Sequence, residues 1–217
     1  MILSLETSTS VCSLALHQEG LCLAEQVYNL PKSHATLMPE VIRQLLDNLN
    51  VQRSALEAIA ISDGPGSYTG LRIGTATGKG LCSALEIPLI SVNSLDIMIE
   101  EMRPIVAGLS YIAPMIDARR MEVYMKLVNK KGSELKDTRA VILTPDLFDN
   151  YIEYPILLVG DGARKCEGFI DHPHLKIVPD IYPRAQCMGI LAFQKFKERS
   201  FENLQDFEPN YLKEFHT

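Results

Sequence analysis

The first part of the chain alternates short apolar runs with polar breaks, which predicts three strands followed by a helix. The β-prone runs are MILSLET, VCSLALHQ and LCLAEQVY, and Glu19-Gly20 is a tight-turn signal between the last two. Thr36 is then placed to cap a helix, and Pro39 to lie in its first turn. After it, apolar residues recur at helical spacing, at Val41, Ile42, Leu45, Leu46 and Leu49.

The next predicted elements complete the first series of strands and helices, and the second part of the chain repeats the same series. ALEAIAIS predicts a strand, the glycine-rich residues 63–80 a loop and a helix, and IPLISV another strand. The second part has strand candidates in YIAPMID, MEVYMKLV, SELKDTRAVIL, YPILLVG and LKIVPD, with short helices expected from Thr144 and in GARKCEGFI. An amphipathic helix over 184–199 closes it. The order β-β-β-α-β-α-β therefore occurs twice.

This duplication predicts an α/β fold with two mixed five-stranded sheets and helices packed on them. The layout is similar to that of the actin/hexokinase/heat-shock-70 ATPase superfamily, a likeness of fold that does not fix function. We expect an N-terminal lobe over residues 1–103 and a C-terminal lobe over residues 104–217, with the boundary near 102–108.

The stretch DGPGSYTGLRIGTATGKG, residues 63–80, comes close to two nucleotide-binding motifs and satisfies neither. A phosphate loop has four residues between its glycines and a Ser or Thr after its Lys, whereas here three residues follow Gly74 and Gly80 follows Lys79. A dinucleotide loop needs an acidic residue at the end of the next strand, and that strand ends at Asn93.

Wound as a helix at about 100° per residue, residues 70–85 place their glycines on one face. That face holds Gly70, Gly74, Gly78, Leu81 and Leu85, and the opposite face holds Arg72, Thr75, Lys79 and Ser83. Because each interior glycine costs roughly 1 kcal/mol relative to alanine, the ridge predicts a surface that another backbone approaches closely. The spacing leaves open whether that backbone belongs to this chain or to a partner. Ser67 is interpreted as a capping serine, because no GxSxG elbow or histidine motif accompanies it.

Charge and composition narrow the function. The net charge of −6 over 217 residues, without a Lys/Arg cluster longer than two, argues against binding nucleic acid alone. Five scattered cysteines without a CxxC indicate reduced thiols. The sequence has no HxxxH or HExxH, and the HPH at 172–174 is interpreted as a loop rather than a metal site. No apolar run reaches the roughly 18 residues of a membrane span, and MILSLETSTS lacks a basic lead, so we expect a soluble, cytoplasmic protein.

The block ISDGPGSYTGLRIGTATGKGLCSALEIPLISVNSL resembles the signature of the bacterial TsaB family, tRNA threonylcarbamoyladenosine biosynthesis proteins that are also described as glycoprotease-like. The similarity runs through most of the chain. It continues in ILSLETSTSVCSLAL, SHATLMPEVIRQLL, the DARRMEVY of residues 117–124, the LVGDGA of 158–163 and the PNYLK of 209–213.

The resemblance implies a non-catalytic partner that binds and activates the paralogue TsaD, together with the ATPase TsaE, in forming threonylcarbamoyladenosine on tRNA. TsaD carries an HxxxH that binds a metal, which this sequence lacks, so the resemblance implies no catalytic residue and no metal here. Contact with tRNA would be indirect, no membrane is implied, and the isolated chain would form a homodimer. The alternative is a glycoprotease-like peptidase or an ATP-binding enzyme of the actin-like superfamily.

The resemblance also implies a partner interface on the first two helices. Its residues are Leu37, Val41, Leu45, Gly70, Arg72, Gly74, Thr75, Gly78 and Lys79. A vestigial nucleotide cleft would comprise Glu6, Thr7, Ser8, Gly160, Asp161 and Gly162. These turns either hydrogen-bond phosphate or bind nothing, so no cofactor is expected, apart from ATP or ADP in the assembled complex.

Overall fold

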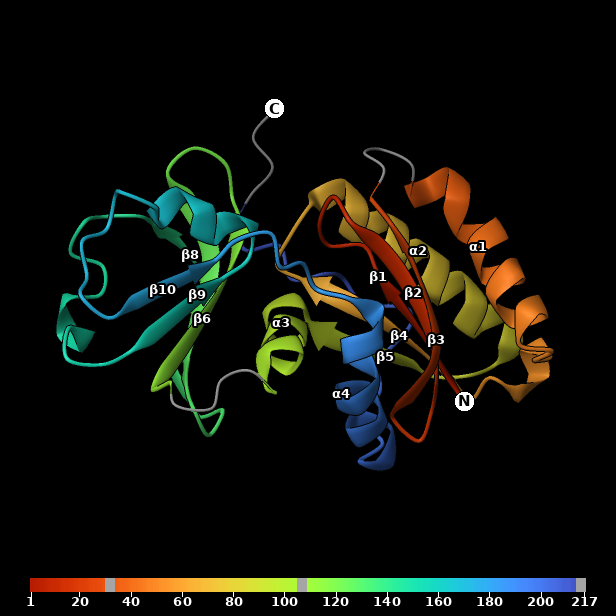
Figure 1. Cartoon of the computed structure of the whole chain (residues 1–217). Helices are drawn as coiled ribbons and strands as arrows, with labels where there is room; N and C mark the ends of the chain where they lie inside the picture. Colours follow the sequence, from red (N-terminus) through yellow and green to blue (C-terminus); the bar gives the residue numbers. More distant parts are fainter. Residues whose placement is uncertain (30–33, 105–108, 214–217) are drawn as a thin grey trace. The chain divides into compact units, whose positions relative to one another are not determined.

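The computed structural model describes residues 1–29, 34–104 and 109–213, and within 34–36 the backbone only. The chain forms two compact units, each with its own five-stranded sheet (Figure 1). Unit 1 comprises Met1–Ile97 and Pro183–Tyr211, and unit 2 comprises Met98–Tyr182 and the chain from Leu212 onward. No helix of the described residues is long and apolar enough to cross a membrane.

The sheet of unit 1 is mixed, in the order β3-β2-β1-β4-β5. Its strands are β1 (Ile2–Glu6), β2 (Cys12–Gln18), β3 (Leu21–Tyr28), β4 (Ala58–Gly64) and β5 (Leu89–Asn93). The first three pair antiparallel, while β4 pairs parallel to β1 and β5 parallel to β4. The short η1 (Arg53–Ala55) precedes β4. The turn at Glu19-Gly20 has positive φ at both residues, as the tight-turn signal predicts.

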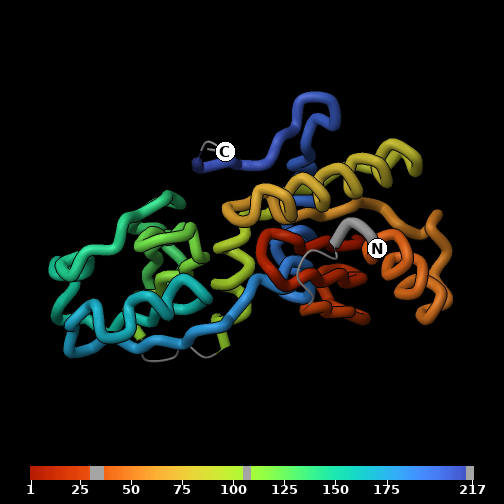
Figure 2. The backbone as a smooth tube through the Cα atoms, turned by 90° about the horizontal axis from the view of Figure 1, so that it is seen from above, coloured from red at the N-terminus to blue at the C-terminus, as the bar shows by residue number. Residues whose placement is uncertain are grey.

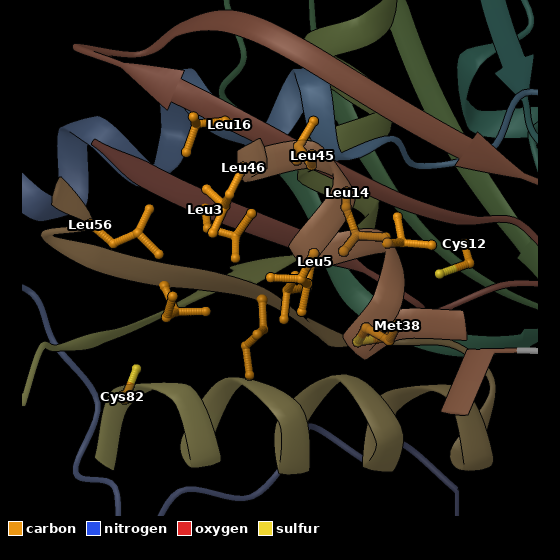
Figure 3. Packing of buried hydrophobic residues seen from close by; sticks show 14 of the residues in the cluster. Leu3, Leu5, Cys12, Leu14, Leu16, Met38, Leu45, Leu46, Leu56 and Cys82 are labelled. Carbon is orange, nitrogen blue, oxygen red and sulfur yellow. The ribbon is translucent and has the colours of Figure 1, made fainter. Parts of the chain in front are cut away.

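Two helices pack on one face of this sheet, α1 (His34–Asn48) and α2 (Tyr68–Leu85). Leucines at alternate positions of β1 and β2 point into the core between the sheet and the two helices. Figure 3 shows these leucines beside Leu45 and Leu46 of α1. Because α1 begins at His34, Thr36 lies inside the helix and Pro39 lies beyond its first turn, so both expected positions are wrong by a few residues.

Unit 2 repeats this topology in the order β10-β9-β6-β7-β8. Its strands are β6 (Tyr111–Asp117), β7 (Glu122–Asn129), β8 (Glu134–Ile142), β9 (Ile156–Val159) and β10 (Leu175–Val178). The antiparallel meander and the parallel pairs recur, so the predicted α/β fold with two mixed five-stranded sheets is confirmed. The two short helices expected here are 3₁₀ helices instead, η2 (Asp149–Tyr151) and η3 (Asp161–Cys166), a form that short connections commonly take.

The units differ from the lobes 1–103 and 104–217 that the sequence suggests. The division falls inside α3 (Ser94–Met102), and the expected boundary reaches residues 105–108, which lie outside the described part. The larger difference is α4 (Ala185–Lys197), which returns to unit 1 and packs on β1, β2, β3 and β5. Its buried Met188 and Ala192 cover the sheet face opposite α1 and α2, and that burial explains the return.

The glycine ridge of α2 faces the turn between β1 and β2, within this chain. A Cβ on Gly70 would lie 2.0 Å from Thr7 O, and one on Gly74 would lie 2.4 Å from Thr7 Oγ1. A Cβ on Gly78 would meet Ile61 of β4 at 2.8 Å, and one on Gly66 would meet Ser8 O at 2.2 Å. At Gly70 the obstructing atom is a backbone oxygen, so the backbone that approaches the ridge there is this chain's own. At Gly74 and Gly78 the obstructing atoms belong to side chains of the same unit.

We predict that Gly70→Ala lowers the free energy of unfolding by about 2–3 kcal/mol, because the added methyl displaces the backbone of Thr7. Gly80→Ala is the matched control on the same helix, since no atom lies within 4 Å of its Cβ position. The control should raise stability by about 0.5–1 kcal/mol through helix propensity. Urea unfolding followed by circular dichroism measures both, and a shift of the same sign in the two variants would contradict the packing argument.

Candidate functional site

The turn between β1 and β2 is polar in sequence and buried in the structure. Glu6, Thr7 and Ser8 are each at most 1% exposed. Ser8 N donates to Glu6 Oε1 at 2.6 Å, and Thr7 Oγ1 donates to Gly70 O at 2.9 Å. Ser67 N donates to Ser8 O at 2.6 Å. The polar groups of the turn therefore fasten it to the glycine-rich loop and to α2.

Glu6 lies at the end of β1 and is fully buried, which raises its pKa from the ordinary 4.5 to about 7. Its second oxygen, Oε2, has no hydrogen-bond partner among the described residues. Asp63, near the end of β4, also has a raised pKa of about 6, again chiefly because of burial, and Lys195 partly offsets this. Two carboxyls at this edge of the sheet therefore titrate near neutrality.

The glycines of the turn after β9 in unit 2 are also required by close packing. A Cβ on Gly160 would lie 2.2 Å from Met115 O, and one on Gly162 would lie 2.9 Å from the carbonyl carbon of Ile116. Gly160 also has a φ of 113°, which glycine adopts at little cost. Asp161 Oδ1 accepts a hydrogen bond from Asp117 N at 2.9 Å, so its carboxylate holds the end of β6.

These contacts do not fit a phosphate cradle. Such a cradle needs free backbone N–H groups that point at the ligand. Ser8 N is bonded to Glu6, Gly160 N donates to Val178 O at 3.1 Å, and Gly162 N is bonded to the Asp161 carboxylate. Each of the six residues predicted for a nucleotide cleft thus has a role in holding its own unit together, and no chemical step through ATP follows from them.

Two other candidate groups are structural as well. Ser67 caps α2, its Oγ accepting a hydrogen bond from Gly70 N at 3.3 Å, as the capping interpretation predicts. His172 of the HPH loop is buried, with Nε2 3.2 Å from Tyr151 O and Nδ1 accepting from His174 N at 3.2 Å. Within the described residues, no three His, Cys, Asp or Glu side chains gather in a way that could hold a metal.

Most of the residues predicted for a partner interface belong to the core of unit 1. Those with buried positions are Val41, Leu45, Gly70, Gly74, Thr75 and Gly78. Figure 3 shows Leu45 among the leucines between the sheet and the helices. The expected placement of Thr75 on the outer face of α2 is therefore wrong, because it lies one turn from the buried Leu71 on the same side as Cys82.

Arg72 is exposed, whereas Leu37 and Lys79 are half-buried. The guanidinium of Arg72 lies over the ring of Tyr68, 5.4 Å from its centroid. Around Arg72 the outer face of α2 carries small side chains, none of which was among the residues predicted for the partner interface. Its exposed residues are Thr69, Arg72, Ala76, Gly80, Ser83 and Ala84. Their spacing of three and four residues is visible in the sequence and could have indicated an exposed helix face. The predicted interface included the glycines of the inner face instead.

A C-terminal strap, residues 203–211, runs beside α2 in unit 1 (Figure 2). Lys79 Nζ donates to Phe207 O at 3.1 Å, and Asn210 N donates to Asp63 O at 2.7 Å. The rings of Tyr68 and Tyr211 lie 4.8 Å apart. Lys79 therefore anchors the strap, a role that its position in the helix pattern did not reveal.

The chain is similar in sequence and in structure to known proteins. Residues 23–150, more than half of the chain, match the family model described as "TsaD: tRNA N6-adenosine threonylcarbamoyltransferase". The "tRNA threonylcarbamoyladenosine biosynthesis protein TsaB" of Bacillus subtilis is 36% identical, over 98% of this chain and 93% of the relative. The solved structure of "YeaZ from Pseudomonas aeruginosa" is 30% identical with a TM-score of 0.82, over 97% of this chain and 99% of that one.

A more distant structure, the ethanolamine utilization protein EutJ of Carboxydothermus hydrogenoformans, shares the fold alone. It is 12% identical with a TM-score of 0.50, over 88% of this chain and 89% of that one. Likeness of this kind shows the fold alone, and it agrees with the duplicated topology of the two sheets.

The buried carboxyl of Glu6 predicts a specific pH dependence. Because its folded-state pKa of about 7 lies above the ordinary 4.5, its stabilising contribution is complete below about pH 4.5 and is lost as the pH rises to about 7. Relative to Glu6→Gln, which stays neutral, the wild type should lose on the order of 3 kcal/mol between about pH 4.5 and pH 8. Urea unfolding at a series of pH values measures the difference.

Glu19→Gln, in an exposed turn of the same unit, is the matched control for the loss of a carboxylate at the surface. Parallel stability curves for Glu6→Gln and the wild type would show that Glu6 is not titrating in this range.

Proposed function

The chain belongs to the TsaB family of tRNA threonylcarbamoyladenosine biosynthesis proteins, and from this premise we propose that it is a non-catalytic partner that activates a TsaD-like paralogue. The paralogue, together with a TsaE-like ATPase, transfers the threonylcarbamoyl group to tRNA. The observation that carries the proposal is the 36% identity to the Bacillus subtilis TsaB over 98% of this chain.

The chemistry of the described residues supports a non-catalytic role. Ser67 in the glycine-rich loop caps α2. Both ring nitrogens of His172, in the HPH loop, have hydrogen-bond partners within unit 2. His17 is buried between Ser4 Oγ at 3.1 Å and Gln186 O at 3.2 Å, so it is not available as a base for Ser67. These engagements favour a scaffold over the peptidase alternative. The occupied N–H groups of the polar turns likewise favour it over an ATP-binding enzyme.

The outer face of α2 is the surface best suited to the partner. It combines small residues with an open position at Gly80, so a partner helix can approach its backbone. The neighbouring outer face of α1 is charged, with Arg43 bonded to Glu40 and to Asp47 at 2.6 Å. Small, mostly uncharged side chains beside a charged rim agree with the depletion of charged residues at the centre of protein interfaces. The same surface would support a homodimer when the chain is isolated, so homodimer and heterodimer would compete for it.

Reconstitution tests the function directly. The purified chain should switch on tRNA modification when it is added to the TsaD-like and TsaE-like proteins of its own organism, with ATP and a threonylcarbamoyl donor. A matched reaction without the chain should show little or no product. Equal modification in the two reactions, or failure of the chain to co-purify with its TsaD-like protein, would refute the activating role.

A substitution on α2 tests the surface. Ala76→Arg places a long charged side chain at the centre of the outer face, and should weaken binding to the TsaD-like protein by about tenfold or more. The melting temperature should be unchanged, because Ala76 is exposed. Gln194→Arg, on the exposed side of α4, is the control that should bind as the wild type does. Undiminished binding by Ala76→Arg would exclude this face as the interface.

A further inference from the structure

The hairpin between β6 and β7 in unit 2 ends in two adjacent arginines with unusual backbone conformations. Arg119 has a φ of 68° and Arg120 a φ of 48°, and both side chains are exposed. Glycine and asparagine hold this left-handed conformation far more readily than arginine does. The hairpin therefore presents two guanidinium groups at positions where turn chemistry alone favours other residues.

The base of the hairpin is clamped from both sides. Lys165 Nζ donates to Asp117 Oδ1 at 2.6 Å and to Glu122 O at 2.9 Å. Lys213 pairs with the Glu122 carboxylate and its Nζ lies 3.4 Å from Ala118 O. Asp117 Oδ1 also accepts from Arg119 N at 2.6 Å, which fixes the start of the turn. These contacts hold the hairpin tip in one geometry.

The same contacts leave the arginine charges uncompensated. Asp117 and Glu122, the carboxylates that flank the tip in sequence, are already paired with lysines. Among the residues that the structure describes, no carboxylate forms an ion pair with the guanidinium of Arg119 or Arg120. In a chain with a net charge of −6, this tip carries two guanidinium groups that no carboxylate of the described residues neutralises.

We propose that the Arg119-Arg120 tip binds backbone phosphates of RNA, an inference that rests on the proposed function because tRNA is the substrate of the complex. A guanidinium is planar and permanently charged, and its parallel N–H groups match two oxygens of a phosphate. The contacts at the base of the hairpin fix the backbone that carries both arginines, so less backbone entropy is lost on binding. Because the chain as a whole is acidic, we expect phosphate contact to be concentrated at this tip and the isolated chain to bind RNA weakly.

The test uses the reconstituted complex with its TsaD-like and TsaE-like partners, and an unmodified tRNA transcript as the probe. Arg119→Asn with Arg120→Gly removes both charges and inserts residues suited to the left-handed conformation, so the fold should be retained or stabilised. The dissociation constant for tRNA is measured over about 50 to 200 mM salt. We expect roughly tenfold weaker binding and a log–log salt slope shallower by about two, one for each lost phosphate contact.

Two further variants sharpen the result. Arg199→Gly removes one exposed arginine that also has a positive φ, at 55° in unit 1, and should leave affinity and slope unchanged. Arg119→Lys with Arg120→Lys keeps the charge but not the planar fork, and should keep the slope while losing part of the affinity. Circular dichroism and melting temperature confirm that each variant is folded.

The outcomes separate this inference from the proposed function. If the Asn-Gly variant assembles and binds tRNA with the wild-type slope, the tip does not contact phosphate, and the proposed function stands. If assembly weakens while the tRNA affinity of the formed complex is unchanged, the tip contacts a protein instead, and the RNA inference is overturned. A wild-type complex that fails to assemble would overturn the proposed function, and the hairpin inference with it.

Discussion

The contact between the β1–β2 turn and the glycines of α2 is the constraint on which unit 1 depends. Thr7 and Ser8 lie so close to α2 and its preceding loop that side chains at Gly66, Gly70 and Gly74 are sterically excluded. Buried hydrogen bonds from Thr7 Oγ1 to Gly70 O and from Ser67 N to Ser8 O then fix the helix against the turn. The inner face of α2 is thereby taken up by the chain itself, and the outer face is what remains for another protein.

The buried polar turn explains why a fold shared with ATPases need not carry their chemistry. A phosphate ligand requires N–H groups that are free and a local charge that is not negative. Here Ser8 N and Gly160 N are already bonded within their own units, and the buried carboxyl of Glu6 lies at the end of β1 beside the turn. The N–H groups of Ser8 and Gly160 hold their own units together and are therefore not free to bind a phosphate.

The strands and the repeated order of elements could be predicted from sequence, because buried strands and turn residues leave a strong local pattern. The type of the short helices could not be predicted, because η2 and η3 depend on how short connections pack on their sheet. The division of the chain into units could not be predicted either, because the position of α4 depends on the burial of Met188 and Ala192 against strands that are distant in sequence. The glycine spacing correctly predicted close approach of a backbone. The assignment of Gly70, Gly74 and Gly78 to a partner interface came from the family resemblance. The spacing of residues alone does not show whether the same chain or another protein packs on a helix face. The roles of Lys79 and of Arg119-Arg120 depend on the strap and on backbone conformation, neither of which leaves a pattern in a single sequence.

The return of the chain to unit 1 makes the main part of the second unit, Met98–Tyr182, an insertion within the first. The sheet of unit 1 is present once residue 93 has been made, yet the helix that covers its second face begins at residue 185. During synthesis, Ile2, Ile90 and the apolar residues around them therefore stay open to solvent while nearly the whole of unit 2 is added. Unit 2 can bury its own core before unit 1 is complete, so the order of emergence from the ribosome favours folding of the second unit first. Until α4 has been made, this apolar sheet face is exposed and is therefore a surface that chaperones can bind. Truncation before α4 would leave the face permanently exposed.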